Sequence, residues 1–145
     1  MPEQPLSEAS AALSFDAFRS TVLTDYRLAM LSREASLLGR REVLGGKAKF
    51  GIFGDGKEVA QVAMAKFFQP GDFRSGYYRD QTFMLAAGLT TVRELFAQLY
   101  ADPDPAHEPA SSGRQMNAHF STPFLDEKGD WLPLTQLKNV SADSS

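Results

Sequence analysis

The sequence predicts an α/β chain that is mostly helical in this segment, with one or two short strands. Three observations predict it: apolar residues recur at helical spacing in several segments, one extended run follows a proline-glycine turn, and a capping-box pattern opens the last helix. The 145 residues, of which 43% are hydrophobic and 23% charged, suffice for one ordinary domain with a core. We expect residues 1–13 to form a mobile leader and residues 14–145 to form the domain.

The first predicted helix begins after Ser14, whose hydroxyl can cap it. We expect Gly39 and the Gly45-Gly46 pair to break this helix, because glycine is unfavourable in helix interiors. The segment 48–53 is too rich in glycine to predict a strand. The apolar positions of the helix recur every three or four residues and continue weakly to Leu38: Phe15, Phe18, Val22, Tyr26 and Ala29.

The middle of the chain alternates helical patterns with clear turn signals. A second helix is predicted over 58–68 and stops at the turn 69–72, and 73–78 is the best strand candidate. A short helix over 81–87 follows, which Gly88 can terminate. Thr91 and Glu94 then form a capping box for a helix over 92–99.

The last third of the sequence has weaker patterns. Residues 101–117 predict a long loop, and loops of more than about 12 residues are usually functional or disordered. Beyond it, we expect Trp131, Leu132 and Leu134 to pack against another surface. No helix stop or closing strand is predicted from Val140 onward, so we expect the domain to be truncated at its C-terminal end.

Composition excludes several classes of function. The formal charge of −3, with both signs mixed along the chain, favours neither nucleic acid nor a membrane surface as a partner. No cysteine is present, which excludes disulfides, thiolate metal sites and a cysteine nucleophile and fits a cytoplasmic protein. With two histidines, a zinc site would need carboxylates from elsewhere, and no serine sits in a nucleophile-elbow pattern.

Tyr78 and Arg79, which follow the predicted strand, form the candidate anion site. A guanidinium fork and a phenolic hydroxyl can together donate several hydrogen bonds to a diphosphate. The alternative is a packing tyrosine beside a solvated arginine, because arginine often does no more than pair at a surface.

Two other segments admit a chemical interpretation. Gly54-Asp55-Gly56 could hold a phosphate or a magnesium ion, but it matches no nucleotide-binding fingerprint, and a tight turn before a helix is the commoner role. Glu58, at the start of that helix, is more often structural than catalytic. His119 follows a flexible glycine and Arg114 and could act near neutral pH, whereas His107 lies in an acidic, proline-rich loop where a solvated role is expected.

The order of these motifs resembles the N-terminal part of the alpha subunit of thiamine-diphosphate-dependent 2-oxoacid dehydrogenases. The branched-chain (2-oxoisovalerate) type is most similar, because its members carry Gly-Arg-Gln-Met where the pyruvate type tends to have Gly-Gly-Ser-Met. The resemblance covers roughly residue 25 to the end. The segments that carry it, in order, are Tyr26-Arg27 with Met30 and Arg33, Gly56–Ala60, Gly71–Phe73, Gly76–Asp80 and Gly113–Met116 with His119.

The resemblance implies a role for particular residues. Tyr78 and Arg79 would bind the diphosphate of thiamine diphosphate, and Glu58 would be a packing or hydrogen-bonding element. Arg114 and His119 would line the approach to the active site. Ser144, with Ser145, would begin the family's Ser-Ser-Pro segment and contribute to a monovalent-cation site.

Two departures from the family pattern are visible. Tyr77 stands where branched-chain enzymes often have glutamine, so one diphosphate contact would be lost or replaced. Gly54-Asp55-Gly56 precedes the Tyr-Arg pair and has no asparagine at the required offset, so Asp55 is not the family's magnesium ligand. The true magnesium motif would lie beyond Ser145.

The implied activity is oxidative decarboxylation of a branched-chain 2-oxoacid with acyl transfer to a lipoyl group. It implies thiamine diphosphate and magnesium as cofactors, a beta-type dehydrogenase half (fused or separate), a lipoyl-bearing acyltransferase and a homo-oligomer. The isolated chain would be inactive. The alternative is a helical interaction or assembly domain that binds no cofactor and buries its exposed aromatic residues against a partner.

Overall fold

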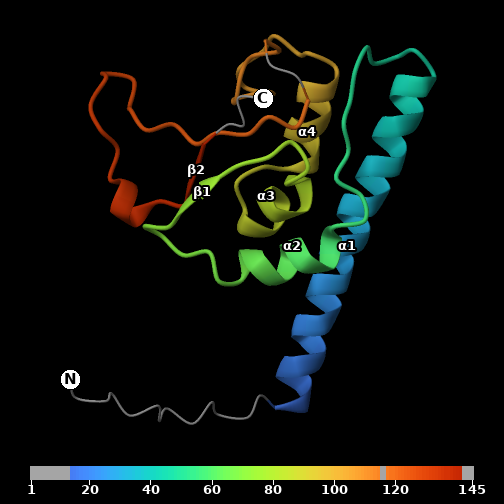
Figure 1. Ribbon diagram of the computed structural model, residues 1–145, viewed down its shortest axis with the longest axis vertical. Coiled ribbons are helices and arrows are strands. Elements are labelled where there is room, and N and C mark those ends of the chain that lie inside the picture. Colours follow the sequence, from blue (N-terminus) through green and yellow to red (C-terminus); the bar gives the residue numbers. More distant parts are fainter. Residues whose placement is uncertain (1–13, 115–116, 142–145) are drawn as a thin grey trace.

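The computed structural model describes residues 14–114 and 117–141, and a long helix, α1 (Phe15–Leu44), runs along one side of them (Figure 1). The Ser14 side chain accepts a hydrogen bond from the Ala17 backbone N–H at 3.2 Å, which confirms the predicted cap. The predicted break at Gly39 is wrong. The helix passes through Gly39 and ends at Leu44, and Gly45 follows it.

Packing explains the glycine inside α1. Gly39 is buried, and a β-carbon placed there would clash with the ring of Phe53. A β-carbon at Gly51 would meet the same ring, at 2.7 Å. The segment after α1 therefore folds back along the helix and places the Phe53 ring between Gly39 and Gly51. Glycine costs ~1 kcal/mol in a helix, and the packing of the Phe53 ring against Gly39 offsets this cost.

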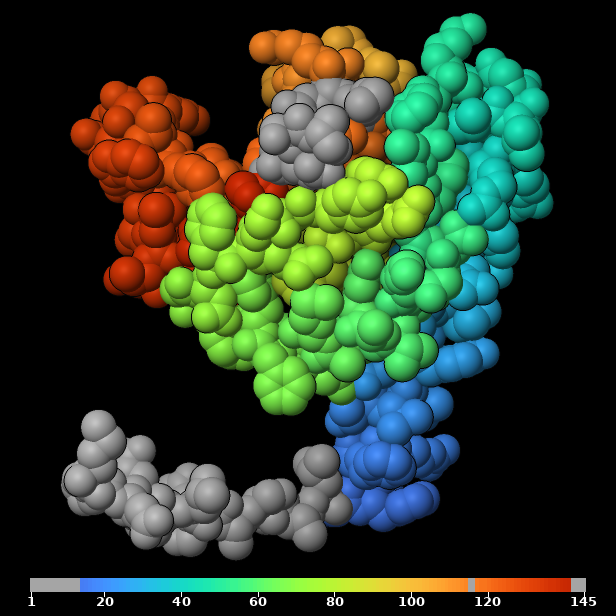
Figure 2. Space-filling model, viewed as in Figure 1, coloured from blue at the N-terminus to red at the C-terminus, as the bar shows by residue number. Residues whose placement is uncertain are grey.

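The apolar residues of the first half of α1 are not buried by the described residues. Phe15 is 76% exposed and Tyr26 is 62% exposed. In Figure 2 the early turns of α1 extend beyond the other elements. The buried residues of α1 lie later in the helix: Ser32, Ala35, Ser36 and Gly39. The helix predicted from these apolar positions is confirmed, but the apolar residues of its first half do not belong to the core of the described residues.

The core forms where α2 (Glu58–Ala65) and α3 (Gln81–Ala87) pack on the middle of α1. The helix α2 ends three residues before the predicted Phe68, whereas α3 has the predicted bounds and is ended by Gly88 in a left-handed conformation (φ +73°). Phe68 and Phe83 meet edge to face at 5.1 Å. The buried core residues include Ala35, Ala65, Phe68, Phe83, Met84, Leu95, Phe120 and Val140.

Buried polar groups fix α3 against α1. The Gln81 side-chain N–H₂ group donates to the carbonyl of Ser32 at 2.9 Å and to the hydroxyl of Ser36 at 3.1 Å. The hydroxyls of Ser32 and Thr82 are hydrogen-bonded at 2.7 Å. Because unpaired polar groups are costly in a core, these bonds select one register between the two helices.

Two strands, β1 (Phe73–Ser75) and β2 (Asn139–Ser141), pair in parallel. The predicted strand 73–78 is too long, because residues 78–80 turn into α3. The Asp80 carboxylate holds this turn by accepting bonds from the Tyr77 backbone N–H at 3.0 Å and from the Arg74 guanidinium at 2.8 Å. The strand β2 overturns the expectation that no closing strand occurs from Val140 onward.

The helix α4 (Val92–Leu99) begins with the predicted capping box. The Thr91 side chain accepts from the Glu94 N–H at 3.2 Å, and the Glu94 carboxylate accepts from the Thr91 N–H at 2.7 Å. The described residues of the segment 101–117 contain no helix or strand, as predicted.

The segment between His119 and β2 extends away from the helices on the side opposite α1 (Figure 1). It contains an isolated bridge between Leu125 and Trp131 and a short 3₁₀ helix, η1 (Leu134–Gln136). Trp131 is 74% exposed, so the described residues do not provide the surface on which it was expected to pack, while Leu132 and Leu134 are half-buried. Within the described part of the chain, no helix is long and apolar enough to cross a membrane.

Candidate functional site

The candidate site lies at the carboxyl ends of β1 and β2. Here the Gly76 N–H donates to the Ser141 carbonyl at 3.0 Å, and a β-carbon at Gly76 would stand 2.6 Å from that carbonyl oxygen. Only glycine fits so close to the neighbouring strand without displacing it. In α/β proteins, ligands bind outside the carboxyl ends of parallel strands, and the chain leads from Gly76 directly to Tyr78 and Arg79.

The turn that carries Tyr78 and Arg79 is held by its backbone. The Arg79 carbonyl accepts a hydrogen bond from the Gln61 side chain at 2.8 Å. A β-carbon at Gly54 would clash with that same carbonyl. Gly54 and the side-chain amide of Gln61 on α2 therefore fix the position of the turn through its backbone. The side chains of Tyr78 and Arg79 are not needed to hold it.

The side chains of this turn form an aromatic and cationic stack. The rings of Tyr77 and Tyr78 lie 4.0 Å apart, and the Arg79 guanidinium lies over the Tyr78 ring at 5.1 Å. Arg79 is exposed and forms no salt bridge with any residue that the structure describes. Its five N–H donors are therefore not committed to a carboxylate, as an anion-binding arginine requires.

His119 lies on a segment that passes the same sheet edge. The carbonyl of Phe120 lies 3.7 Å from the β-carbon position at Gly76, and the Thr122 N–H donates to the Val140 carbonyl at 2.9 Å. His119 itself is 8% exposed. The structure thus brings the His119 segment to the strand ends that lead to the Tyr-Arg turn.

Arg114 has a different position. It is exposed and lines a cleft of about 390 Å³ at the end of α4, together with Lys47, Lys49 and Tyr100. The family resemblance implies that Arg114 and His119 line one approach to the active site, but the structure gives them different surroundings.

A buried carboxylate that the sequence reading missed organises the loop before Arg114. Glu108 is 2% exposed and accepts hydrogen bonds from the backbone N–H groups of Ala110 (3.0 Å), Ser111 (2.9 Å) and Gly113 (2.9 Å). The Ser111 hydroxyl adds a fourth donor at 2.6 Å. Nothing in the local pattern singles out Glu108, because one acidic residue in a polar loop is ordinarily solvated.

Glu58 and Asp55 are both committed to arginines of α1. The Glu58 carboxylate forms a two-pronged pair with Arg33 at 2.5 and 2.8 Å and also accepts from the Gly56 N–H at 3.0 Å. These bonds, led by that of Arg33, lower the pKa of Glu58 to about 2 despite its burial. Asp55 pairs with Arg40 at 2.6 Å, so Gly54-Asp55-Gly56 forms a turn that joins the segment to α1.

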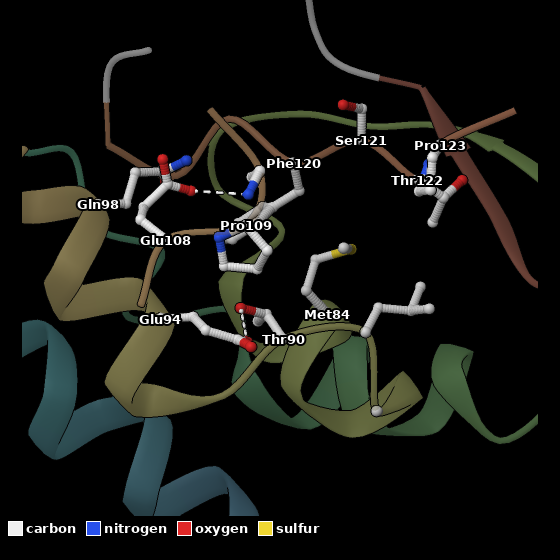
Figure 3. Close-up of a pocket in the computed structure, with 13 residues that line it drawn as sticks. Met84, Thr90, Glu94, Gln98, Glu108, Pro109, Phe120, Ser121, Thr122 and Pro123 are labelled. Atoms are coloured by element: carbon white, nitrogen blue, oxygen red, sulfur yellow. Dashed lines mark hydrogen bonds between the residues drawn. The ribbon is translucent and has the colours of Figure 1, made fainter. Parts of the chain in front are cut away.

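A second cavity, of about 370 Å³, lies between α3, α4 and the segment 108–123 (Figure 3). Its carboxylates are those of Glu94, which closes the capping box of α4, and of Glu108, which binds its own loop. Its walls are largely apolar, with Met84, Leu89 and Phe120 among them. Among the described residues, no Lys, Arg or His side chain lines this cavity, so it offers no cationic donor to a diphosphate and does not compete with the Tyr-Arg turn as a phosphate site.

Ser144, the predicted monovalent-cation ligand, lies outside the described residues. Within residues 14–114 and 117–141, no group of three or more His, Asp or Glu side chains could hold a metal ion.

Comparison with known proteins assigns the family. The profile of the dehydrogenase E1 component family matches residues 26–129, and the chain belongs to this family. Over 100 residues it is 37% identical to the 2-oxoisovalerate dehydrogenase subunit alpha of Bacillus subtilis (strain 168), an alignment that covers 66% of this chain and 28% of that relative. The predicted resemblance is confirmed, and the chain spans less than a third of that relative's length. No solved structure matches the chain.

Proposed function

We propose that the chain forms part of the alpha component of a thiamine-diphosphate-dependent 2-oxoacid dehydrogenase. The family membership supports an E1 dehydrogenase, and the name of the B. subtilis relative supports a branched-chain 2-oxoacid as substrate. The reaction is oxidative decarboxylation followed by transfer of the acyl group to a lipoyl group. On this proposal, the described residues belong to a thiamine-diphosphate-binding fold.

The observation that carries the proposal is the fixed turn after β1, which presents Arg79 without a salt bridge within the described residues. A diphosphate fits the donor set of this turn, because the Arg79 guanidinium neutralises charge and the Tyr78 hydroxyl donates one hydrogen bond. Thiamine diphosphate, when bound, supplies the carbanion chemistry that makes decarboxylation of a 2-oxoacid possible. Tyr78 and Arg79 bind and orient its diphosphate, and Gln61 and Gly54 keep their turn in place.

Further parts of the active site come from outside the described residues. Magnesium takes its ligands there, and Ser144 contributes to a monovalent-cation site. The partners are a beta-type half, fused or separate, and a lipoyl-bearing acyltransferase, and the chain itself is present in more than one copy in this cytoplasmic assembly. Of the two residues that would line the approach of substrate or acyl acceptor, Arg114 is exposed and His119 is buried.

The test uses the intact-length protein that contains this chain, assembled with its beta-type half. We expect decarboxylation of 3-methyl-2-oxobutanoate in the presence of thiamine diphosphate and magnesium, with a higher kcat/KM than for pyruvate. Tyr78→Phe should raise the cofactor concentration needed for half-maximal activity about fivefold, because it removes one hydrogen bond. Tyr26→Phe, on the exposed first half of α1, serves as the matched control. Equal activity without thiamine diphosphate would refute the proposal.

The exposed apolar side chains of α1 and α2 favour a second candidate, a helical interaction domain. A groove between these helices is lined by Val22, Tyr26, Val59 and Phe67, and Phe67 is 82% exposed. Such a surface is typical of a protein interface. Saturable binding of a protein partner, with no response to the cofactor, would favour this candidate over the enzyme.

A further inference from the structure

The cleft of about 390 Å³ at the end of α4 is lined by three cations and, among the described residues, by no carboxylate. Lys47 and Lys49 come from the segment after α1, and Arg114 comes from the loop that follows α4 (Figure 1). Tyr100 and Phe50, which are 48% and 45% exposed, supply aromatic surface. The cleft therefore combines positive charge with apolar surface, and its volume is that of a small-molecule site.

Two of the three cations are not committed to an acidic partner. The Lys47 ammonium donates to the Glu42 carboxylate at 3.1 Å, which neutralises it. Lys49 and Arg114 are exposed and form no salt bridge with any residue that the structure describes. Attraction to the negative C-terminal end of α1 accounts for the two lysines that follow this helix. It does not account for Arg114, which belongs to a different loop.

Glu42, near the end of α1, joins one wall of the cleft to α4. Its carbonyl accepts from the backbone N–H groups of Lys47 and Ala48 at 2.9 and 3.1 Å, and Ala48 is 4% exposed. Its carboxylate accepts from the Tyr100 hydroxyl at 2.7 Å as well as from Lys47. The backbone that leads to Lys49 and the ring of Tyr100 are therefore in place before a ligand binds, which lowers the entropic cost of binding.

The loop before Arg114 is fixed to the end of α4 independently. The Glu108 carboxylate accepts from the Gly113 N–H at 2.9 Å, and Gly113 adopts φ +74°. A β-carbon at Gly113 would stand 2.6 Å from the Ala101 carbonyl oxygen. The chain therefore passes close to the end of α4 immediately before Arg114, so two separate supports bring the arginine and the lysines to one cleft.

We propose that this cleft binds a nucleoside phosphate. Lys49 and Arg114 bind the phosphate oxygens, and the planar base packs against Tyr100 and Phe50. Two uncommitted cations match the several charges of a diphosphate better than the single charge of a carboxylate, and an arginine fork fits phosphate oxygens. Exposed aromatic rings suit a base, because every base has a face that can stack. The site is separate from the Tyr-Arg turn, so the inference goes beyond the proposed function.

Calorimetric titration with adenosine diphosphate (ADP), at an ionic strength of about 0.15 M, tests the proposal. It uses the intact-length protein with its beta-type half, in an Arg79→Ala background so that the Tyr-Arg turn does not hold the phosphates. We expect saturable binding that Lys49→Met with Arg114→Met weakens at least about tenfold, because charge-assisted contacts are lost. The control Lys57→Met with Lys128→Met removes the same charge at exposed positions outside the cleft and should bind like the background protein.

Two further ligands test what the cleft recognises. Adenosine lacks the phosphates and inorganic pyrophosphate lacks the base, so each should bind at least about fivefold more weakly than ADP. The proposal is overturned if ADP does not bind saturably, or if adenosine or pyrophosphate binds as tightly as ADP. Equal ADP affinity in folded Lys49→Met with Arg114→Met, or an equal loss in the Lys57→Met with Lys128→Met control, would also overturn it.

Discussion

The Glu58 carboxylate joins α1 to α2 through Arg33 and at the same time accepts the Gly56 N–H. Its pKa of about 2, against an ordinary 4.5, means that the folded state favours the ionised form. That contribution is fully present above about pH 4.5 and is lost as the pH falls through about 2. The shift corresponds to ~3 kcal/mol, which we reduce to about 2 because Arg33 is 42% exposed and screened by solvent.

We therefore predict that Glu58→Gln lowers the free energy of unfolding by about 2 kcal/mol at pH 7. The difference from wild type should shrink between pH 4.5 and 2, where wild-type Glu58 becomes protonated. Urea titrations at pH 7 and pH 3 measure it. Arg40→Met, which removes a more exposed pair, is the control and should cost less than about 1 kcal/mol. A Glu58→Gln difference that does not change with pH would contradict this reading.

Gly39 offers a second prediction at the same scale. Gly39→Ala should destabilise the chain by about 1–3 kcal/mol, because the new β-carbon meets the Phe53 ring and this strain exceeds the gain in helix propensity. Thermal unfolding measures the effect. In a Phe53→Leu background the same change should cost less, and an equal cost in both backgrounds would show that Phe53 is not the cause.

At the scale of elements, α4 connects a local sequence signal to the candidate site. Its capping box fixes where the helix begins and therefore which face carries Leu95 and Gln98 toward residues 117–119. We predict that Thr91→Ala costs about 1 kcal/mol of stability and increases hydrogen exchange at the Ala118 amide. Thr135→Ala, at an exposed threonine outside α4, should do neither. If the Ala118 amide exchanges at the wild-type rate in Thr91→Ala, the capping box does not influence residues 117–119, and the prediction is contradicted.

The helices were predictable because their signals are local. Ser14, Gly88 and the Thr91–Glu94 pair act within one turn of the residues that they cap. By contrast, β2 and the continuous α1 depend on residues that are distant in the sequence. The strand β2 forms because Asn139 pairs with Phe73, 66 positions earlier. The helix α1 continues through Gly39 because the Phe53 ring packs there. The Tyr-Arg turn could be selected from the sequence as a candidate anion site, because the chemistry of its side chains is local. The contacts that Gln61 and Gly54 make with its backbone arise only in the folded chain. The same holds for the hydrogen bonds of Glu108 and Gln98.

At the scale of the whole molecule, the Tyr-Arg turn provides donors for a diphosphate, whereas the described residues provide no metal cluster and leave much of α1 uncovered. On the proposed function, the described residues form one wall of the cofactor site. We predict that the isolated 145-residue chain shows no decarboxylation of branched-chain 2-oxoacids when thiamine diphosphate and magnesium are added. A spectrophotometric assay that detected turnover would contradict this.

The central claim is that Arg79 and its turn bind the diphosphate of thiamine diphosphate. Calorimetric titration of the intact-length protein with thiamine diphosphate and magnesium tests it most directly. We predict saturable binding that Arg79→Ala weakens at least about tenfold, the loss expected for a charge-assisted contact, while the control Arg27→Ala, an exposed arginine of α1, binds like wild type. Wild-type affinity in a folded Arg79→Ala protein would contradict the claim.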